Sequence, residues 1–159
     1  MRNNAERWLA SGTGQQQESA QRLLAAMGEL VTSETTALAA RLDGAGLATR
    51  VVEAFRANVM SGTEQKVVRV LLDNPGSTSA KLSATINWKA QTWHMHFGTM
   101  CGNRSDYLWA TPIPAKRSST FLSGVLATYD EANSGFTMRP EAVVGFAVLG
   151  ISVKARNAA

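Results

Sequence analysis

The sequence predicts a mainly α-helical protein with a small β-hairpin near its carboxyl end. Apolar residues recur at helical spacing in residues 15–42, and short segments of helical periodicity, separated by glycine or proline, fill residues 47–101. Residues 120–138 alternate as strands do around a turn. With 159 residues, 45% of them hydrophobic, the chain is long enough to bury a core without disulfides or metals.

A long helix is predicted over residues 15–42, which contain no proline and a single glycine. Its apolar residues are spaced by three, four or seven: Ala20, Leu24, Met27, Val31, Leu38 and Leu42. At about 1.5 Å per residue this helix extends for roughly 40 Å, which favours pairing with another helix. Glu34 and Thr35 interrupt the heptad pattern, so a coiled coil with a second copy and an antiparallel hairpin with the next helix both remain open. The polar residues 11–17 predict a frayed start.

Residues 43–46 form a glycine-rich turn, after which a second helix is expected over residues 47–60. A third helix follows at residues 63–74, with Thr63 as its cap and Asn74-Pro75-Gly76 as its end.

Two further short helices are expected before the hairpin. One opens at Ser77, Thr78 or Ser79 and ends at Asn87, with Leu82 and Ile86 on its buried face. The next begins near Trp88, and its buried stripe consists of Trp93, Phe97 and Met100 or Cys101.

The remaining chain predicts a β-hairpin and a closing helix. Residues 107–109 and 120–129 have the texture of strands, residues 130–135 form a turn, and residues 136–138 return. A last helix starts at Pro140 and stops at Gly150. We therefore expect three regions: a helical self-association region at 1–61, a compact domain at 62–150, and a loose tail at 151–159.

The order of three short helices and a hairpin resembles that of winged helix-turn-helix domains. The resemblance covers residues 63–138 and is carried by VVRVLLDNPGSTSAKLSATINWKAQTWHMHF, in which a helix ends in Asn-Pro-Gly and the third helix packs through Trp93 and Phe97. The connection between the third helix and the hairpin, residues 101–119, is longer than in compact members of the family. The resemblance implies that the third helix enters the DNA major groove and that the hairpin, the wing, touches the flanking backbone.

The resemblance and the residue types together predict a nucleic-acid-binding surface. With Trp93 and Phe97 inward, the opposite face of the third helix presents residues that can contact base edges or phosphates: Lys89, Gln91, Thr92, Met95 and His96. Residues at the start of the second short helix are expected to contact phosphates: Ser77, Thr78, Ser79 and Lys81. Lys116 and Arg117 add positive charge. The alternative is that all of these are ordinary cap and surface residues.

The distribution of charge agrees with a polyanionic partner. The net charge is +4, and residues 1–61 contain six basic and six acidic side chains, so the whole excess lies in residues 62–159. Within residues 78–118, Lys81, Lys89, Arg104, Lys116 and Arg117 face the single acid Asp106. A solvated, slightly basic surface would have the same composition.

No catalytic or cofactor-binding pattern is found, and we expect neither enzymatic activity nor a cofactor. Both histidines, His94 and His96, and the only cysteine, Cys101, lie in one segment. Two histidines separated by one residue diverge on a helix, and zinc needs three or four converging ligands, so a metal site is not expected. Cys101 is expected to be a buried structural residue. No phosphate-binding glycine loop of either common type is present.

The sequence thus predicts a small cytoplasmic DNA-binding regulator of the transcriptional repressor type. It has no run of 18 apolar residues and no signal-like apolar core near Met1, so we expect an intracellular protein. A homodimer is expected because two recognition helices read two half-sites of double-stranded DNA. The alternative is a protein-binding module or inhibitor that engages a partner through its helices and its aromatic residues: Trp88, Trp93, Trp109, Phe121 and Tyr129.

Overall fold

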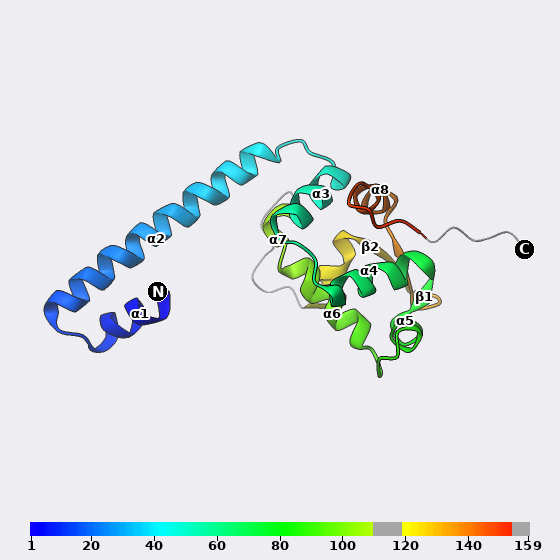
Figure 1. Cartoon of the computed structure of the whole chain (residues 1–159), viewed down its shortest axis with the longest axis horizontal. Coiled ribbons are helices and arrows are strands. Elements are labelled where there is room, and N and C mark those ends of the chain that lie inside the picture. The colour runs from blue at the N-terminus through cyan, green and yellow to red at the C-terminus, as the bar shows by residue number, and fades with distance from the viewer. Residues whose placement is uncertain (110–118, 154–159) are drawn as a thin grey trace, which may run out of the picture. The chain divides into compact units, whose positions relative to one another are not determined.

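The computed structural model describes residues 1–109 and 119–153 and divides the chain into two compact units (Figure 1). We call them the amino-terminal unit, Met1–Arg41, and the carboxy-terminal unit, Leu42–Ala159. The mainly helical fold with a small hairpin is confirmed. The sequence led us to expect a division at residue 61, which is 20 residues later than the observed one.

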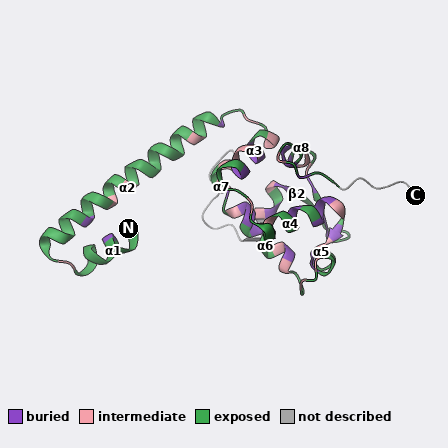
Figure 2. Cartoon of the chain, viewed as in Figure 1, coloured by how far each residue is buried: buried purple, intermediate pink, exposed green. Residues whose placement is uncertain are grey.

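The amino-terminal unit consists of α1 (Arg2–Ser11) and α2 (Gly14–Arg41), which pack against each other. The long predicted helix is confirmed to within one residue at each end. The frayed start is wrong, because residues 2–11 form a helix and the side chain of Gln16 accepts a hydrogen bond from the backbone N–H of Thr13 at 2.9 Å at the turn. Only Ala5 and Ala20 are buried in this unit (Figure 2).

The carboxy-terminal unit contains the other described elements, and their order is helix, helix, strand, two helices, two short helical turns, two strands and helix. In sequence they are α3 (Leu47–Ala57), α4 (Gly62–Asp73), β1 (Ser77–Thr78), α5 (Ser79–Thr85), α6 (Thr92–Gly102), α7 (Ser105–Leu108), the 3₁₀ helix η1 (Ser119–Val125), β2 (Ala127–Asp130), β3 (Gly135–Met138) and α8 (Pro140–Val148).

The three strands form one antiparallel sheet in the order β1-β3-β2. The predicted hairpin is confirmed, with Ala127 opposite Met138 and Asp130 opposite Gly135. β1 was not expected as a strand; it pairs with the start of β3, Thr78 lying opposite Gly135. β3 pairs with both β1 and β2 and is therefore the central strand of the sheet.

Two segments with strand-like texture are helical instead. Residues 105–108 form α7, whose first turn is closed by hydrogen bonds from the Tyr107 and Leu108 backbone to the Arg104 carbonyl oxygen. Residues 119–125 form η1, which packs on α6 and ends just before β2. Apolar content alone did not separate these short helical turns from strands, because a four-residue segment shows too little of either period.

Specific caps fix where the helices start and end. Ser61, not Thr63, caps α4: its Oγ accepts from the Glu64 N–H at 3.2 Å, and Glu64 Oε2 accepts from the Ser61 N–H at 2.8 Å. α5 ends in a left-handed Asn87 with φ of 60°, after which the Trp88 N–H donates to the Ser83 carbonyl.

α8 ends in the same way, at Gly150, whose φ is 78°. The backbone N–H of Ile151 then donates to the Phe146 carbonyl at 2.9 Å, and the Ile151 side chain is buried in the core. The tail expected to be loose from residue 151 therefore begins with a packed residue. Residues 154–159 lie outside the described part.

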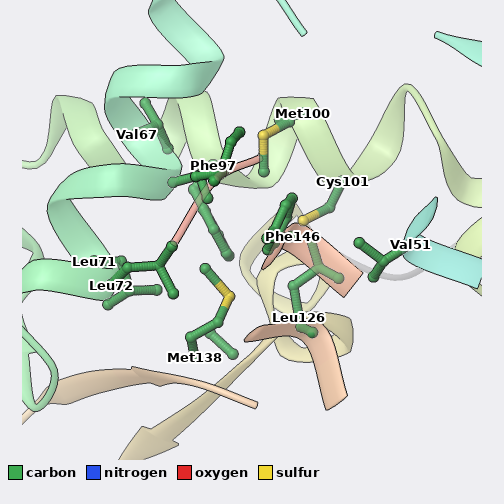
Figure 3. Close-up of a cluster of buried hydrophobic side chains, with 14 of the residues drawn as sticks. Val51, Val67, Leu71, Leu72, Phe97, Met100, Cys101, Leu126, Met138 and Phe146 are labelled. Carbon is green, nitrogen blue, oxygen red and sulfur yellow. The ribbon is translucent and has the colours of Figure 1, made fainter. Parts of the chain in front are cut away.

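The core of the carboxy-terminal unit is one continuous apolar cluster (Figure 3). It is built from the inward faces of α3, α4, α5, α6 and α8 and from the sheet, and its largest fully buried apolar side chains include Trp93, Phe97, Phe146, Leu71, Leu82, Met100 and Leu126. Trp93 also donates its indole N–H to the Val67 carbonyl at 3.0 Å. The predicted inward orientation of Trp93 and Phe97 is confirmed.

α3 belongs to this unit because it packs against α8 and α7. The contact with α8 is close: a Cβ at Gly145 would lie 2.8 Å from the Ala48 carbonyl oxygen and from Val51. Within the amino-terminal unit, the helix that packs on α2 is α1, which precedes it in the chain. No helix in the described part of the chain is both long enough and apolar enough to cross a membrane.

Candidate nucleic-acid interface

α6 has one exposed stripe and is otherwise covered. Trp93, Phe97, Met100 and Cys101 are buried against α4 and η1. The outward face follows the i, i+3, i+4, i+7 spacing: Met95, His96 and Thr99 are exposed, and Thr92 is half-buried and donates its Oγ1–H to the Lys89 carbonyl at 2.6 Å. Met95 is 74% exposed, so this face is open within the carboxy-terminal unit.

The third helix begins later than expected, at Thr92 rather than near Trp88. Asn87 and Ala90 both have positive φ, so the chain turns between α5 and α6 instead of continuing as a helix. Lys89 and Gln91, which were expected on the helix, lie in this turn, and both are exposed. Gln91 occupies the position immediately before the first turn of α6.

The junction between α5 and α6 is held by one buried hydrogen bond. Ser83 of α5 is fully buried, and its Oγ accepts from the backbone N–H of Trp93 at 2.9 Å. This bond satisfies a donor in the first turn of α6 and fixes the start of that helix on α5. The exposed stripe is therefore presented from a rigid pair of helices.

The residues that were expected to contact phosphates at the start of the second short helix differ in how far they are exposed. Ser77 and Ser79 are 6% and 7% exposed, and Ser79 Oγ donates to the Gln91 carbonyl at 3.5 Å, so we leave both out of the interface. Thr78 caps α5 through a 3.2 Å bond from the Lys81 N–H and is half-buried. Lys81 is exposed and remains available to a phosphate.

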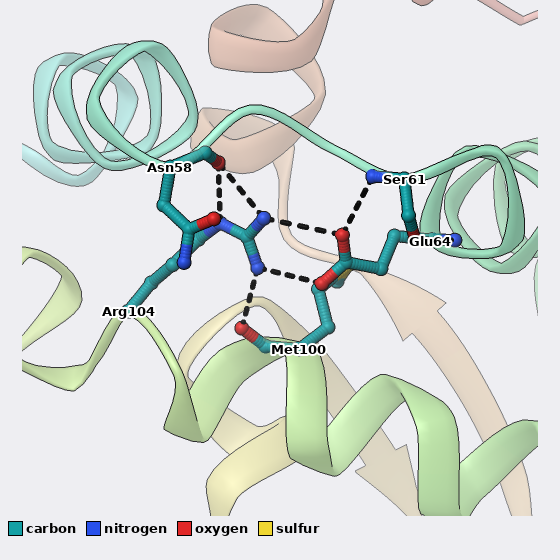
Figure 4. Close-up of polar contacts among 5 residues, drawn as sticks. All are labelled: Asn58, Ser61, Glu64, Met100 and Arg104. Carbon is teal, nitrogen blue, oxygen red and sulfur yellow. Dashed lines mark hydrogen bonds and ion pairs between the residues drawn. The ribbon is translucent and has the colours of Figure 1, made fainter.

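Arg104 does not contribute to a positive surface. It is 1% exposed, and its guanidinium donates to both carboxylate oxygens of Glu64, at 2.8 and 3.2 Å, and to the carbonyls of Asn58 and Met100 (Figure 4). The guanidinium carbon also lies 4.3 Å from the centre of the Phe55 ring. Arg104 therefore joins the end of α3, the cap of α4 and the end of α6, and the local count of positive charges overestimates the surface charge.

Charge along this surface is mixed. Lys81 and Lys89 are exposed beside α5 and α6, whereas the hairpin turn carries Asp130 and Glu131, which are exposed as well. Asp130 is occupied in that turn, because its carboxylate accepts from the Ala132 N–H at 2.9 Å and from the Asn133 amide at 2.7 Å. Lys116 and Arg117 lie outside the described residues.

A groove lies between the hairpin and the starts of α5 and α6, with a volume of about 770 Å³. We call it the hairpin groove. Its walls come from the first turn of α5, from Gln91 and His94, from the end of η1, from Tyr129 and Phe136 of the hairpin, and from Arg139, which lies between β3 and α8. Ligand-binding pockets have volumes of about 300–1,000 Å³.

The two histidines have separate environments, as their spacing predicts. His94 is half-buried, its Nε2 lies 3.2 Å from Ser123 Oγ, and burial lowers its pKa below the ordinary value. His96 is exposed, and its ring lies 4.8 Å from that of Trp88. Among the described residues no group of three His, Cys, Asp or Glu side chains is placed to hold a metal ion.

Cys101 is fully buried, as expected. Burial raises the pKa of the thiol, so the side chain stays protonated and is a poor nucleophile and a poor metal ligand.

The pKa of Glu64 is shifted in the opposite direction. Burial alone would raise its pKa, but the hydrogen bonds from Arg104 and Ser61 and the charge of Arg104 outweigh that effect and hold the pKa below its usual value.

Three residues of this region were not among the predicted site residues. Thr99 completes the exposed stripe at i+7 from Thr92, and that spacing alone could have found it. His94 and Arg139 line the hairpin groove, but nothing in the sequence brings η1, the hairpin and α6 together.

Of the aromatic residues considered as protein-binding anchors, Trp93 is buried, Trp88 and Trp109 are half-buried and Tyr129 is exposed. The side chain of Phe121 lies outside the described part.

No family model, curated protein or solved structure matches this chain.

Proposed function

We propose that the chain is a DNA-binding regulator whose carboxy-terminal unit is a winged helix-turn-helix domain. The observation that carries the proposal is the joint arrangement of α4, β1, α5, α6 and the β2–β3 hairpin, with the sheet order β1-β3-β2. In such domains the helix at the position of α6 is the one that enters the major groove, and α6 has a single open face.

The proposed contact surface is smaller than the sequence alone indicates. Bases are read by the stripe of Thr92, Met95, His96 and Thr99, together with Gln91 in the preceding turn; amide, hydroxyl and apolar groups of this kind contact adenine and the thymine methyl group. Lys81 and Lys89 contact phosphates and fix the register on the duplex. Lys116 and Arg117 remain candidates from the sequence.

To test this proposal, a binding sequence is selected from random duplexes with the full chain. The affinity of the chain for the selected duplex is then measured by fluorescence anisotropy at several salt concentrations. The decisive pair of variants is Met95→Glu, on the exposed stripe, and Gln65→Glu, on the exposed side of α4. Both add one negative charge to an exposed helix position. We expect Met95→Glu to lose roughly tenfold or more in affinity, as loss of one good base contact does, and Gln65→Glu to stay near wild type.

Lys89→Ala tests the phosphate contact separately. It should weaken binding to all sequences alike and reduce the slope of log affinity against log salt by about one. Failure of the selection to enrich any duplex at low salt would contradict the proposal, and so would equal affinities of the Met95→Glu and Gln65→Glu proteins.

Self-association through α2 is part of the proposal. Leu30 and Val31 are 59% and 56% exposed, and Leu38 lies on the same face two turns further along. Helices that carry such an apolar stripe are stable when a partner covers it, and a second copy provides an equal stripe. Leu30→Glu should shift the mass measured by light scattering toward the monomer. Ala25→Glu, on the opposite side of α2, should not; equal masses for all three proteins would overturn this part.

One observation favours a second candidate function, a protein-binding module. The described stripe of α6 contains no lysine or arginine, while it presents Met95 and the paired rings of His96 and Trp88. A face without basic side chains that exposes a methionine beside aromatic rings suits a protein surface. If the selection returns no duplex and cross-linking of the full chain in cells yields a partner at residue 95, this second function replaces the first.

A further inference from the structure

The hairpin groove has the size and lining of a small-molecule site, and this inference goes beyond the proposed DNA contact and does not depend on it. Its volume, about 770 Å³, lies within the range of pockets that enclose a ligand of one or two rings. Most of its lining residues carry a polar group and come from four separate segments of the chain, although more apolar than polar surface faces the groove. Such a combination orients a ligand while its apolar part is removed from water.

The floor of the groove is a row of aromatic rings. The rings of Tyr129 and Phe136 are 4.9 Å apart, and those of Phe136 and His94 are 5.1 Å apart. Phe136 is supported from below by Trp93 at 5.2 Å, so its ring is held in place by the core. Tyr129 is 52% exposed and leaves part of its ring open. The rings of Tyr129 and His94 are inclined to that of Phe136 by 48° and 46°, so a flat aromatic ligand can stack on the open face of Tyr129 and meets the other two rings at an angle.

The groove has opposite charges at its two ends. Arg139 follows β3, whereas Glu131 follows β2 at the turn, and the four-residue strands between them span about 13 Å at about 3.3 Å per residue. An anionic group is therefore attracted to the Arg139 end and repelled from the Glu131 end, which gives the ligand one orientation.

The side chain of Arg139 is held in a position from which it can bind an anion. Its Nε donates to the Gly124 carbonyl at 2.9 Å, which holds the side chain against the end of η1. Among the described residues neither terminal nitrogen of this guanidinium is engaged in a hydrogen bond, so the two terminal N–H groups, which bind a carboxylate end-on, are available. A guanidinium already held in this way loses little conformational entropy on binding.

Neutral hydrogen-bonding groups lie between the two ends. His94 Nε2 and Ser123 Oγ are 3.2 Å apart on one wall, and Thr78 stands on the other. These groups add no second cation: Arg139 is the one arginine or lysine among the described residues that line the groove, so a ligand with a single carboxylate matches it.

We propose that the hairpin groove binds an aromatic monocarboxylate, with the carboxylate on Arg139 and the ring on Tyr129, Phe136 and His94. The probe that tests this is 2-naphthoate, compared with 2-naphthalenemethanol, which has the same ring system and no charge. Binding to the full chain is measured by calorimetry, and the contacted residues are identified from backbone amide shifts in NMR spectra.

We expect saturable binding of 2-naphthoate at one site, at least tenfold weaker binding of the alcohol, and amide shifts confined to the hairpin, the end of η1 and the start of α6. Arg139→Gln should reduce the affinity for 2-naphthoate by tenfold or more and leave the affinity for the alcohol unchanged. Arg69→Gln, which removes an exposed arginine of α4 that does not line the groove, is the matched control.

Tyr129→Ala provides a second variant at an exposed position, and it should weaken both probes alike because only the stacking surface is lost. Each variant is accepted only if its melting temperature stays at the wild-type value. The proposal is overturned if 2-naphthoate does not saturate, if the shifts lie elsewhere, if the alcohol binds as tightly as the acid, or if Arg69→Gln and Arg139→Gln have equal effects.

Discussion

The two units of this chain are both helical but are stabilised in different ways. In the amino-terminal unit Ala5 and Ala20 are buried and nearly every other residue is exposed, whereas the carboxy-terminal unit surrounds a continuous apolar cluster (Figure 2). α2 has 28 residues and is supported by local interactions such as the Arg22–Glu18 pair. The helices of the other unit have 4 to 12 residues, too short to be stable alone, and depend on packing.

The sharpest test of this difference removes one tryptophan from each unit. Trp93→Ala should lower the free energy of unfolding by about 3–5 kcal/mol, because it empties the centre of the core and leaves the Val67 carbonyl without its indole donor. Trp8→Ala, at a 41% exposed position of α1, should change it by no more than about 0.5 kcal/mol. Urea unfolding followed by tertiary and helical circular dichroism measures both, and equal losses would refute the contrast.

The same comparison can be made with ion pairs. Arg104→Ala removes the buried partner of Glu64 and should cost about 3–5 kcal/mol, since a partly buried carboxylate and two carbonyls lose their donors. Arg22→Ala breaks an exposed pair at i, i+4 and should cost less than about 0.5 kcal/mol. Unfolding midpoints in urea give both values. Similar losses of unfolding free energy in the two variants would show that burial does not determine how much these ion pairs stabilise the protein.

Glycine-to-alanine substitution should have opposite signs in the two units. At Gly28 nothing lies within 4 Å of the added Cβ, so Gly28→Ala should stabilise α2 by up to about 1 kcal/mol through helix propensity. At Gly145 the Cβ would meet the Ala48 carbonyl oxygen at 2.8 Å, so Gly145→Ala should destabilise the other unit by about 1–3 kcal/mol. Hydrogen exchange resolves the two effects by region; a gain at residue 145 would contradict the close packing of α8 on α3.

The smallest expected effect is a pH dependence of the carboxy-terminal unit. Because burial lowers the pKa of His94, its contribution to stability is present above the ordinary value of 6.5 and is lost as the pH falls below it. The pKa of Glu64 is lowered as well, so the contribution of this carboxylate to stability is also lost as the pH falls below the ordinary value of 4.5. Unfolding curves at pH 7.5 and 5.5 should differ for the wild type and less for His94→Gln. An unchanged difference in that variant would rule out His94 as the cause.

Most helix positions could be predicted because proline, glycine and asparagine mark their ends in the sequence. α2, α4 and α8 were located to within one or two residues from such signals and from apolar spacing. β1 could not be found, because two residues are too few to show a period and their pairing partner β3 lies more than 50 residues away. The start of α6 was placed too early, because the chain turns again at Ala90, whose φ is 50°, and alanine is not a residue type that marks a left-handed turn.

The candidate site was harder to predict than the fold, since it depends on which polar side chains remain exposed. Ser77, Ser79 and Arg104 have the residue types of a DNA-contacting surface, yet all three are buried. Burial of Arg104 depends on Glu64, forty residues earlier, and no local pattern records that pairing. Thr92, Met95 and His96 were predicted on the outward face of α6 from helical spacing, because Trp93 and Phe97 are turned inward; Thr99 has the same spacing and was missed.

The close contact between α3 and α8 has a consequence for synthesis of the chain on the ribosome. α1 and α2 are neighbours in sequence and can pair as soon as both have emerged. α3 must wait for a partner whose central residue, Gly145, is translated more than 90 residues after Val51, which takes roughly 5–20 s at about 5–20 residues per second. During that interval the face of α3 that packs on α8 has no lasting cover, and this nascent segment is where we expect a chaperone to bind.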